Sequence, residues 1–227
     1  MKQKIYQIDA FASERFKGNP AAVCVMQSWL PKTTMQNIAQ ENNLAETAFT
    51  VLEHGKYTIR WFTPETEVDL CGHATLATAY VVFNYYKHPE NTIQFYSPRS
   101  GELNVVKNAN KLISLNFPAD APKEVPQHEE INQAIGKTPL KTLKGKTDYL
   151  LIYSSQEDII GLNPNHFLLN QIDCRGVIVS APGKTVDFVS RFFAPACGVP
   201  EDSVTGSANT TMIPFWSKQL GKTNLSA

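Results

Sequence analysis

The sequence has 227 residues, of which 42% are hydrophobic and 19% are charged, and its 21 Lys and Arg residues balance its 21 Asp and Glu residues. This apolar content is enough for a large core and excludes a disordered chain. A chain without net charge has no basic footprint for nucleic acid, and no apolar run reaches the roughly 18 residues of a membrane span, so we expect neither partner.

The cysteines and the N-terminus bear on the cellular location. The four cysteines (Cys24, Cys71, Cys174 and Cys197) stand far apart, with no C-x-x-C pair. The N-terminal stretch MKQKIYQIDAF lacks the long apolar region and the cleavage site of a secretory signal. We therefore expect reduced thiols and a cytoplasmic protein.

The first half of the chain consists mainly of short apolar runs typical of strands. Gly18-Asn19-Pro20 is a turn signal between two such runs, and Glu53-His54-Gly55-Lys56 predicts a hairpin. Apolar residues at helical spacing predict a helix near 33–43. The expected strands are 4–11, 21–26, 47–52, 57–62, 91–97, 102–107 and 111–117.

A second helix is expected to open at Gly72, in the stretch DLCGHATLATAYVVF. Its residues ATLATAYVVF are apolar or small on every face. A helix without a polar side has to be buried all round, so we expect it at the centre of its domain.

The stretch PADAPKEVPQ at 118–127 is rich in Pro and charge and predicts a boundary between two domains, 1–117 and 118–227. In the second half, a final helix is expected to open at the turn Thr205-Gly206-Ser207. Each half then has several strands followed by a glycine turn that feeds a helix, which suggests a repeated design. The other elements expected there are helices near 129–135 and 164–171 and strands at 148–153, 174–181 and 186–193.

The two glycine turns, Gly72-His73-Ala74 and Gly206-Ser207-Ala208, are the main functional signal. Helix N-termini carry N–H groups without helical partners, and a preceding glycine lets a ligand approach them. If the two helix starts meet across a cleft, they form a double cradle for a carboxylate. The chain lacks the phosphate loop G-x-x-x-x-G-K-[ST] and the dinucleotide fingerprint G-x-G-x-x-G, and we expect no cofactor.

Cys71 and His73 allow three interpretations. Zinc needs three or four ligands, and no further motif at short spacing completes the set, so we expect no metal. A nucleophilic pair is disfavoured because side chains at i and i+2 of a helix start diverge. The third interpretation is that Cys71 is a small buried residue.

Glu46 and Asp202 are the acidic candidates. Glu46 lies in the apolar run NNLAETAF, either facing outward from a strand or held in a pocket, where desolvation would raise its pKa toward that of a proton shuttle. The sequence alone favours the exposed position. Asp202 precedes the second glycine turn, where an acid is also a good helix cap.

Four stretches together resemble the PhzF family of phenazine-biosynthesis-like isomerases: IDAFASERFKGNPAAVCV, IAQENNLAETAF, FTPETEVDLCGHATLATA and FAPACGVPEDSVTGSAN. They occur in the family's order between residues 8 and 209. The resemblance implies an α+β fold like that of diaminopimelate epimerase. In that fold two similar halves each consist of a mixed β-sheet wrapped around a central helix, with the active site between them.

The resemblance also implies roles for individual residues. Glu46 corresponds to the acid/base glutamate that moves a proton between carbons, and His73 and Asp202 correspond to polar partners that hold the substrate and tune its protonation. The implied substrate-binding residues are Asn19, Gly72, His73, Gly206 and Ser207.

Two departures concern the related epimerases and the C-terminus. Those epimerases use two opposed cysteines, but this chain has Ser203 at the second position, so Cys71 is interpreted as a bystander. Family members usually continue beyond G-K-T-x-L, and the closing C-terminal strands are expected to be missing here. A non-catalytic protein that keeps the cleft is therefore the alternative to an isomerase, and an amino-acid epimerase is a third hypothesis.

The favoured hypothesis is a cofactor-independent isomerase of a small carboxylate-bearing metabolite. Glu46 would abstract and return the proton, and the two glycine turns would anchor the carboxylate or the developing charge. The sequence leaves the oligomeric state open, although a homodimer is common in the family that it resembles.

Overall fold

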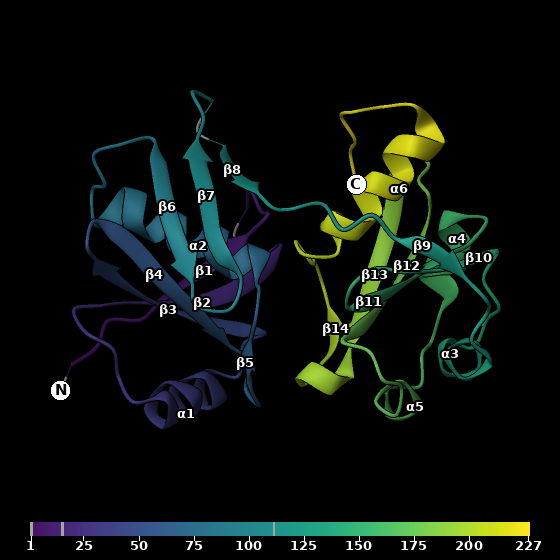
Figure 1. The fold of residues 1–227 in the computed structure, drawn as a ribbon, viewed down its shortest axis with the longest axis horizontal. Coiled ribbons are helices and arrows are strands. Elements are labelled where there is room, and N and C mark those ends of the chain that lie inside the picture. Colours follow the sequence, from purple (N-terminus) through teal and green to yellow (C-terminus); the bar gives the residue numbers. More distant parts are fainter. Residues whose placement is uncertain (1, 15, 111) are drawn as a thin grey trace. The chain divides into compact units, whose positions relative to one another are not determined.

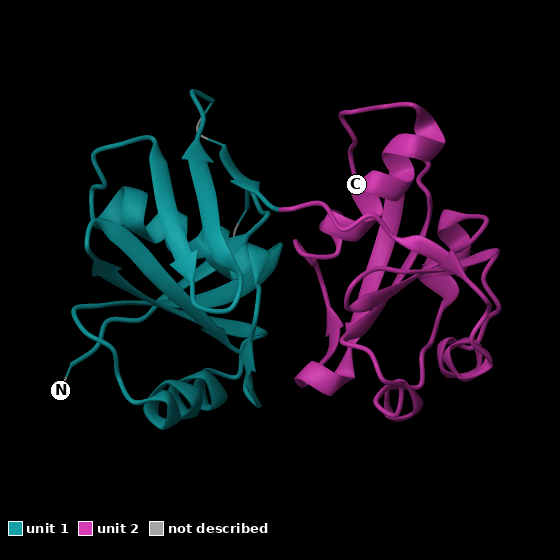
Figure 2. Cartoon of the chain, in the orientation of Figure 1, with its two compact units in different colours: residues 1–117 teal, residues 118–227 magenta. Residues whose placement is uncertain are grey.

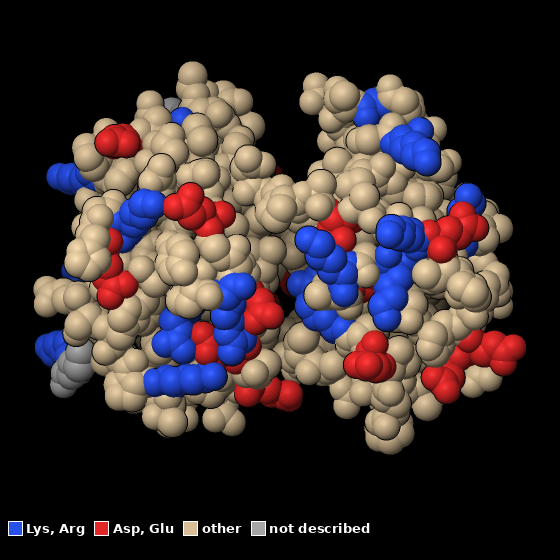
Figure 3. All heavy atoms as spheres, in the orientation of Figure 1, with Lys and Arg blue, Asp and Glu red and all other residues tan. Residues whose placement is uncertain are grey.

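The computed structural model describes residues 2–14, 16–110 and 112–227. The chain forms two compact units, residues 1–117 (unit 1) and 118–227 (unit 2), which Figure 2 shows in different colours. In the described part of the chain, no helix combines the length and apolar character needed to cross a membrane. Side chains of both charges, Lys and Arg as well as Asp and Glu, are present on the face drawn in Figure 3.

Unit 1 contains one mixed eight-stranded sheet in the order β1-β2-β3-β4-β6-β7-β8, with β5 paired to β4 (Figure 1). The pairs β2–β3 and β4–β6 are parallel and the others are antiparallel. Its strands are β1 (Tyr6–Ala10), β2 (Asn19–Met26), β3 (Glu46–Glu53), β4 (Lys56–Phe62), β5 (Glu67–Val68), β6 (Thr92–Ser97), β7 (Gly101–Lys107) and β8 (Ile113–Asn116). Its helices are α1 (Lys32–Asn42) and α2 (Gly72–Tyr85).

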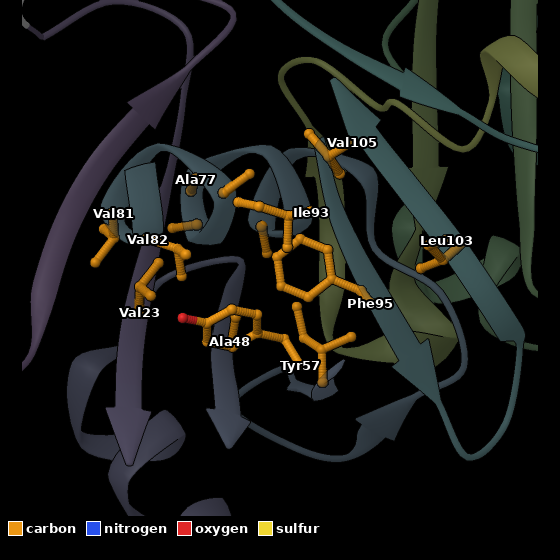
Figure 4. Packing of buried hydrophobic residues seen from close by; sticks show 14 of the residues in the cluster. Val23, Ala48, Tyr57, Ala77, Val81, Val82, Ile93, Phe95, Leu103 and Val105 are labelled. Atoms are coloured by element: carbon orange, nitrogen blue, oxygen red, sulfur yellow. The ribbon is translucent and has the colours of Figure 1, made fainter. Parts of the chain in front are cut away.

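The centre of unit 1 is α2, which begins at Gly72 as predicted and is buried along most of its length. It contacts β1, β2 and β3 near one end of the strand order and β8 at the other end, so the sheet curves around it. Figure 4 shows this packing, with Ala77 and Val82 of α2 among the strand residues Val23, Ile93 and Phe95. The sheet wrapped around a helix is therefore confirmed for this half.

The other side of the sheet carries α1. Met35 and Ala39 of α1 pack on Cys24, Phe49 and Phe62. Because successive strand residues point to opposite faces, Val23 faces α2 while Cys24 faces α1. Both faces of β2 and β3 are thus buried.

The hairpin of β3 and β4 is confirmed. Glu53 pairs with Lys56, which leaves a two-residue loop, and its residues His54 and Gly55 both have positive φ, at 51° and 80°. Two positive φ angles define the type I′ turn, whose twist matches that of the flanking strands.

Unit 2 contains a six-stranded sheet in the order β14-β13-β12-β11-β10-β9, in which β11 and β12 are parallel. Its strands are β9 (Lys123–Val125), β10 (Lys141–Lys144), β11 (Asp148–Ile152), β12 (Gly176–Pro182), β13 (Phe188–Ala194) and β14 (Val199–Asp202). Its helices are α3 (Glu129–Ile135), α4 (Gln156–Gly161), α5 (His166–Leu169), the 3₁₀ turn η1 (Pro195–Cys197) and α6 (Asn209–Leu220).

Helices cover both faces of this sheet. Met212 and Trp216 of α6 pack with Leu150 and Ile178 on one face. The alternate strand residues, such as Leu151, pack with α3, α4 and α5 on the other face. Within the residues the structure describes, the sheet meets α6 from one side only, so the wrapping expected for this half is not seen there.

The first and last segments of unit 2 differ in detail from the sequence prediction. The stretch 118–127, predicted as the boundary between the two halves, includes the short strand β9, which pairs with β10. The last helix begins at Asn209, with Ala208 as its N-cap, and not at the Thr205-Gly206-Ser207 turn. Asp202 ends β14, so the alternative interpretation of Asp202 as a helix cap is wrong.

Candidate functional site

Three elements of unit 1 bring polar side chains to one place. Asn19 is the first residue of β2 and Glu46 the first residue of β3. These strands are parallel, and Glu46 pairs with Ala21, so both starts lie at the same edge of the sheet. The N-terminus of α2 reaches the same edge, because His73 contacts both side chains.

His73 is the centre of this group. Its Nδ1 lies 3.4 Å from Asn19 Nδ2, and its Nε2 lies 3.3 Å from Glu46 Oε2. An amide nitrogen only donates, so Nδ1 accepts and the ring proton of neutral His73 sits on Nε2, the ring nitrogen nearest to Glu46. With its amide nitrogen toward the ring, Asn19 therefore sets the tautomer of His73.

Burial sets the protonation state of His73. Its side chain is 2% exposed, and desolvation lowers its pKa from 6.5 to about 4. The ring is therefore neutral near neutral pH. Glu46 is 13% exposed, so the exposed position favoured by the sequence is wrong.

Cys71 also belongs to this group. Its Sγ lies 3.5 Å from His73 Nδ1, so the expectation that the two side chains diverge is wrong. The reason is that Cys71 is the N-cap of α2, with extended φ −140° and ψ 113°, and does not follow the helical rotation from residue to residue.

These contacts also define the best candidate for a metal. One donor atom each from Glu46, Cys71 and His73 lies within 4.8 Å of the others. Cys71 approaches Nδ1 and Glu46 approaches Nε2, so an ion shared by all three would need a side chain to move. The absence of a metal stays a prediction.

Backbone N–H groups border the same place. The helical bond from Thr75 N to Cys71 O is the first of α2, so the N–H groups of Gly72, His73 and Ala74 precede the helical ladder. These groups and the helix dipole favour a negative charge at this terminus. The N-cap of α2 is Cys71, whose side chain makes no capping hydrogen bond to the first turn of the helix.

The predicted residues of unit 2 form a second group. Asp202 Oδ2 accepts a hydrogen bond of 2.6 Å from Thr205 Oγ1, within the turn that leads to Gly206 and Ser207. Bonds from Asn209 N to Gly206 O and from Thr210 N to Ser207 O connect this turn to α6. Ser207 accepts a further bond of 3.2 Å from Arg175 Nη1.

Arg175 and Asp148 are residues of this group that the sequence analysis missed. Asp148 is 1% exposed and accepts from both Nε and Nη2 of Arg175. A signal was present, because each charged residue stands at or directly before the start of a buried strand. Each of the two groups lies within a single unit.

Comparisons with known proteins identify the family. The model of the phenazine biosynthesis-like proteins, PhzC-PhzF, matches residues 8–227. A protein of Pseudomonas aeruginosa named as an uncharacterized isomerase is 46% identical over 227 residues, covering 100% of this chain and 86% of that protein.

Solved structures agree with this. A PhzF-family structure from Enterococcus faecalis is 49% identical, with a TM-score of 0.92, over 100% of this chain and 86% of that one. A structure named as a predicted epimerase from Pseudomonas aeruginosa, at 18% identity and a TM-score of 0.69 over 97% of this chain and 83% of that one, shares the α+β fold. The names of the similar proteins support an isomerase. The chain belongs to the PhzC-PhzF family of phenazine biosynthesis-like proteins.

Proposed function

We propose that this protein moves a proton on a small carboxylate-bearing metabolite, with Glu46 as the group that accepts and returns the proton. The observation that carries the proposal is the contact of Glu46 with buried His73 beside the N-terminus of α2. A general acid/base group has to stand in a protected place beside groups that stabilise the charge it creates.

The reaction requires charge stabilisation on the substrate. When ionised Glu46 takes a proton from a C–H bond next to a carbonyl or a double bond, the electron pair of that bond moves into the substrate. The N–H groups of Gly72, His73 and Ala74 supply dipoles that stabilise this negative charge or anchor the substrate carboxylate. Return of the proton from Glu46 to another carbon completes an isomerisation without a net change in atoms or electrons.

Neutral His73 suits this task. A protonated ring beside Glu46 would favour the ionised carboxylate and oppose protonation of Glu46 by the substrate. Burial lowers the pKa of His73 to about 4, so the ring supplies an N–H dipole without a full charge. Glu46 then remains able to hold a proton between its two transfers.

The family resemblance assigns further substrate contacts to Asp202, Gly206 and Ser207. These assignments stay predictions.

Deuterium incorporation tests the proposal. Purified wild type, Glu46→Gln and the exposed α1 variant Glu41→Gln are incubated in D₂O with small carboxylates that carry an acidic C–H bond, and incorporation is measured by mass spectrometry. We expect exchange in the wild type and in Glu41→Gln, and a reduction of about 10²–10⁴-fold in Glu46→Gln. Equal exchange in all three proteins would remove Glu46 from the mechanism. A carboxylate that raises the melting temperature but never exchanges would instead support a non-catalytic binding protein.

A further inference from the structure

In unit 2, the side chain of Ser207 is held by Arg175. Arg175 lies directly before β12, and its guanidinium connects two side chains. Nε and Nη2 donate to the carboxylate of Asp148, and Nη1 donates to Ser207 Oγ at 3.2 Å. One planar group thus links a buried acid to the hydroxyl of the glycine turn.

The position of the guanidinium is restricted from several sides. Asp148 is 1% exposed, and its pairing with both Nε and Nη2 fixes the plane of the guanidinium. The guanidinium carbon Cζ lies 5.5 Å from the centre of the Phe192 ring. Gly176 leaves room for the Phe192 ring, because a Cβ at position 176 would lie 2.5 Å from Cζ of Phe192.

The chemistry of the donor decides the direction of the serine proton. Arginine has only donors, so Ser207 Oγ has to accept from Nη1. The hydroxyl hydrogen then points away from Arg175. Because Ser207 is 6% exposed, its hydroxyl orientation is set by the protein more than by solvent.

We propose that Arg175, held by Asp148, is a positioning residue that orients the Ser207 hydroxyl as a hydrogen-bond donor toward an anionic group of the substrate. This inference rests on the proposed function, because that function supplies the anionic substrate. The contact between Arg175 and position 207 is testable without it.

The decisive test uses a thiol as a probe. In Ser207→Cys, the introduced sulfur replaces Oγ beside the guanidinium, which stabilises a thiolate. The rate of alkylation by iodoacetamide is measured against pH and assigned by peptide mass spectrometry, which separates the introduced thiol from the four natural ones. The reference protein carries Asp148→Asn and Arg175→Met in addition, so that neither charge of the buried pair is left alone.

We expect the alkylation midpoint to be lower by about one pH unit or more when Arg175 and Asp148 are present. Equal midpoints would overturn the proposal, whatever reaction the protein catalyses. If thermal unfolding shows that the reference protein does not fold, Ser207→Cys with Arg175→Lys replaces it. Lysine keeps a charge for Asp148 but lacks the forked geometry, so its midpoint should lie above that of Ser207→Cys alone.

Any carboxylate that undergoes exchange provides a second readout. Arg175→Lys and Ser207→Ala should each raise KM by about tenfold with little change in kcat, as expected for one lost hydrogen bond to a charged group. The double variant should lose no more than either single variant. Additive losses would show that Arg175 acts apart from Ser207 and would overturn the proposal, whereas loss of exchange in Glu46→Gln concerns only the proposed function.

Discussion

Burial of His73 predicts that unit 1 loses stability in mild acid. The pKa of His73 is about 4 in the folded protein, lowered from 6.5 by desolvation. Between these values the unfolded chain binds a proton that the folded chain does not, so the free energy of unfolding falls as pH decreases. From about pH 7.5 to about pH 4.5, this single group should cost about 2.5 kcal/mol.

His73→Asn and His54→Asn provide the comparison. His54 is exposed in the β3–β4 turn at a φ of 51°, a conformation that asparagine tolerates. His54→Asn removes an exposed histidine from the same unit and serves as the control for the substitution. In His73→Asn, the fall in the free energy of unfolding between the two pH values should be smaller than in the wild type by about 2.5 kcal/mol. This difference does not depend on the stability of the variant at neutral pH.

Urea-dependent hydrogen exchange, followed by mass spectrometry on peptides from β3 and β4, measures the free energy of opening for unit 1 alone. The reasoning is refuted if wild type and His73→Asn lose the same free energy between the two pH values. A loss that is larger in His73→Asn than in the wild type would show that His73 gains a proton in the folded state.

Two further predictions use pairs of glycines. Gly176→Ala places a Cβ 2.5 Å from the Phe192 ring, so the free energy of unfolding of unit 2, measured in urea, should fall by about 1–3 kcal/mol. Gly161→Ala is the control, because a Cβ there meets no packing neighbour within 4 Å and should cost nothing. Equal stability of the two variants would contradict the packing of Phe192 on Gly176. Gly18→Ala and Gly55→Ala share a φ of 80°, which costs about 1–2 kcal/mol for alanine, but the Cβ at 18 would also lie 2.1 Å from a β1 carbonyl oxygen. Thermal unfolding should therefore show a larger fall in melting temperature for Gly18→Ala than for Gly55→Ala. Equal falls would contradict the close approach of Gly18 to the β1 carbonyl oxygen.

Much of the fold follows from local sequence signals. The turn at His54-Gly55 and the alternating runs around it predict the β3–β4 hairpin, and the apolar run after Gly72 predicts a buried helix. Short strands were missed, since β5 has two residues and β9 has three, too few to show alternation. The helix α4 was also missed, although Ser155 and Asp158 form a capping box.

The candidate site was predictable in its residues but not in its contacts. The motifs selected Asn19, Glu46 and His73, yet their proximity depends on the parallel pairing of β2 with β3 and on the entry of α2 at the same edge. Parallel pairing joins segments across a crossover, and no local pattern encodes it. Asp148 and Arg175 are recognisable in the sequence as charged residues at strand starts, but their contact depends on the parallel pairing of β11 with β12 and has no local signal.

The central place of α2 has a consequence for synthesis on the ribosome. The helix is complete at Tyr85, but β6, β7 and β8, which close the sheet around it, are translated afterwards, between residues 92 and 116. Until they emerge, the nascent chain carries a helix that is apolar on every side and covered by only part of its sheet, a state prone to aggregation. Fragments that end between α2 and β8 should therefore be recovered in inclusion bodies, while residues 1–117 remain in the supernatant.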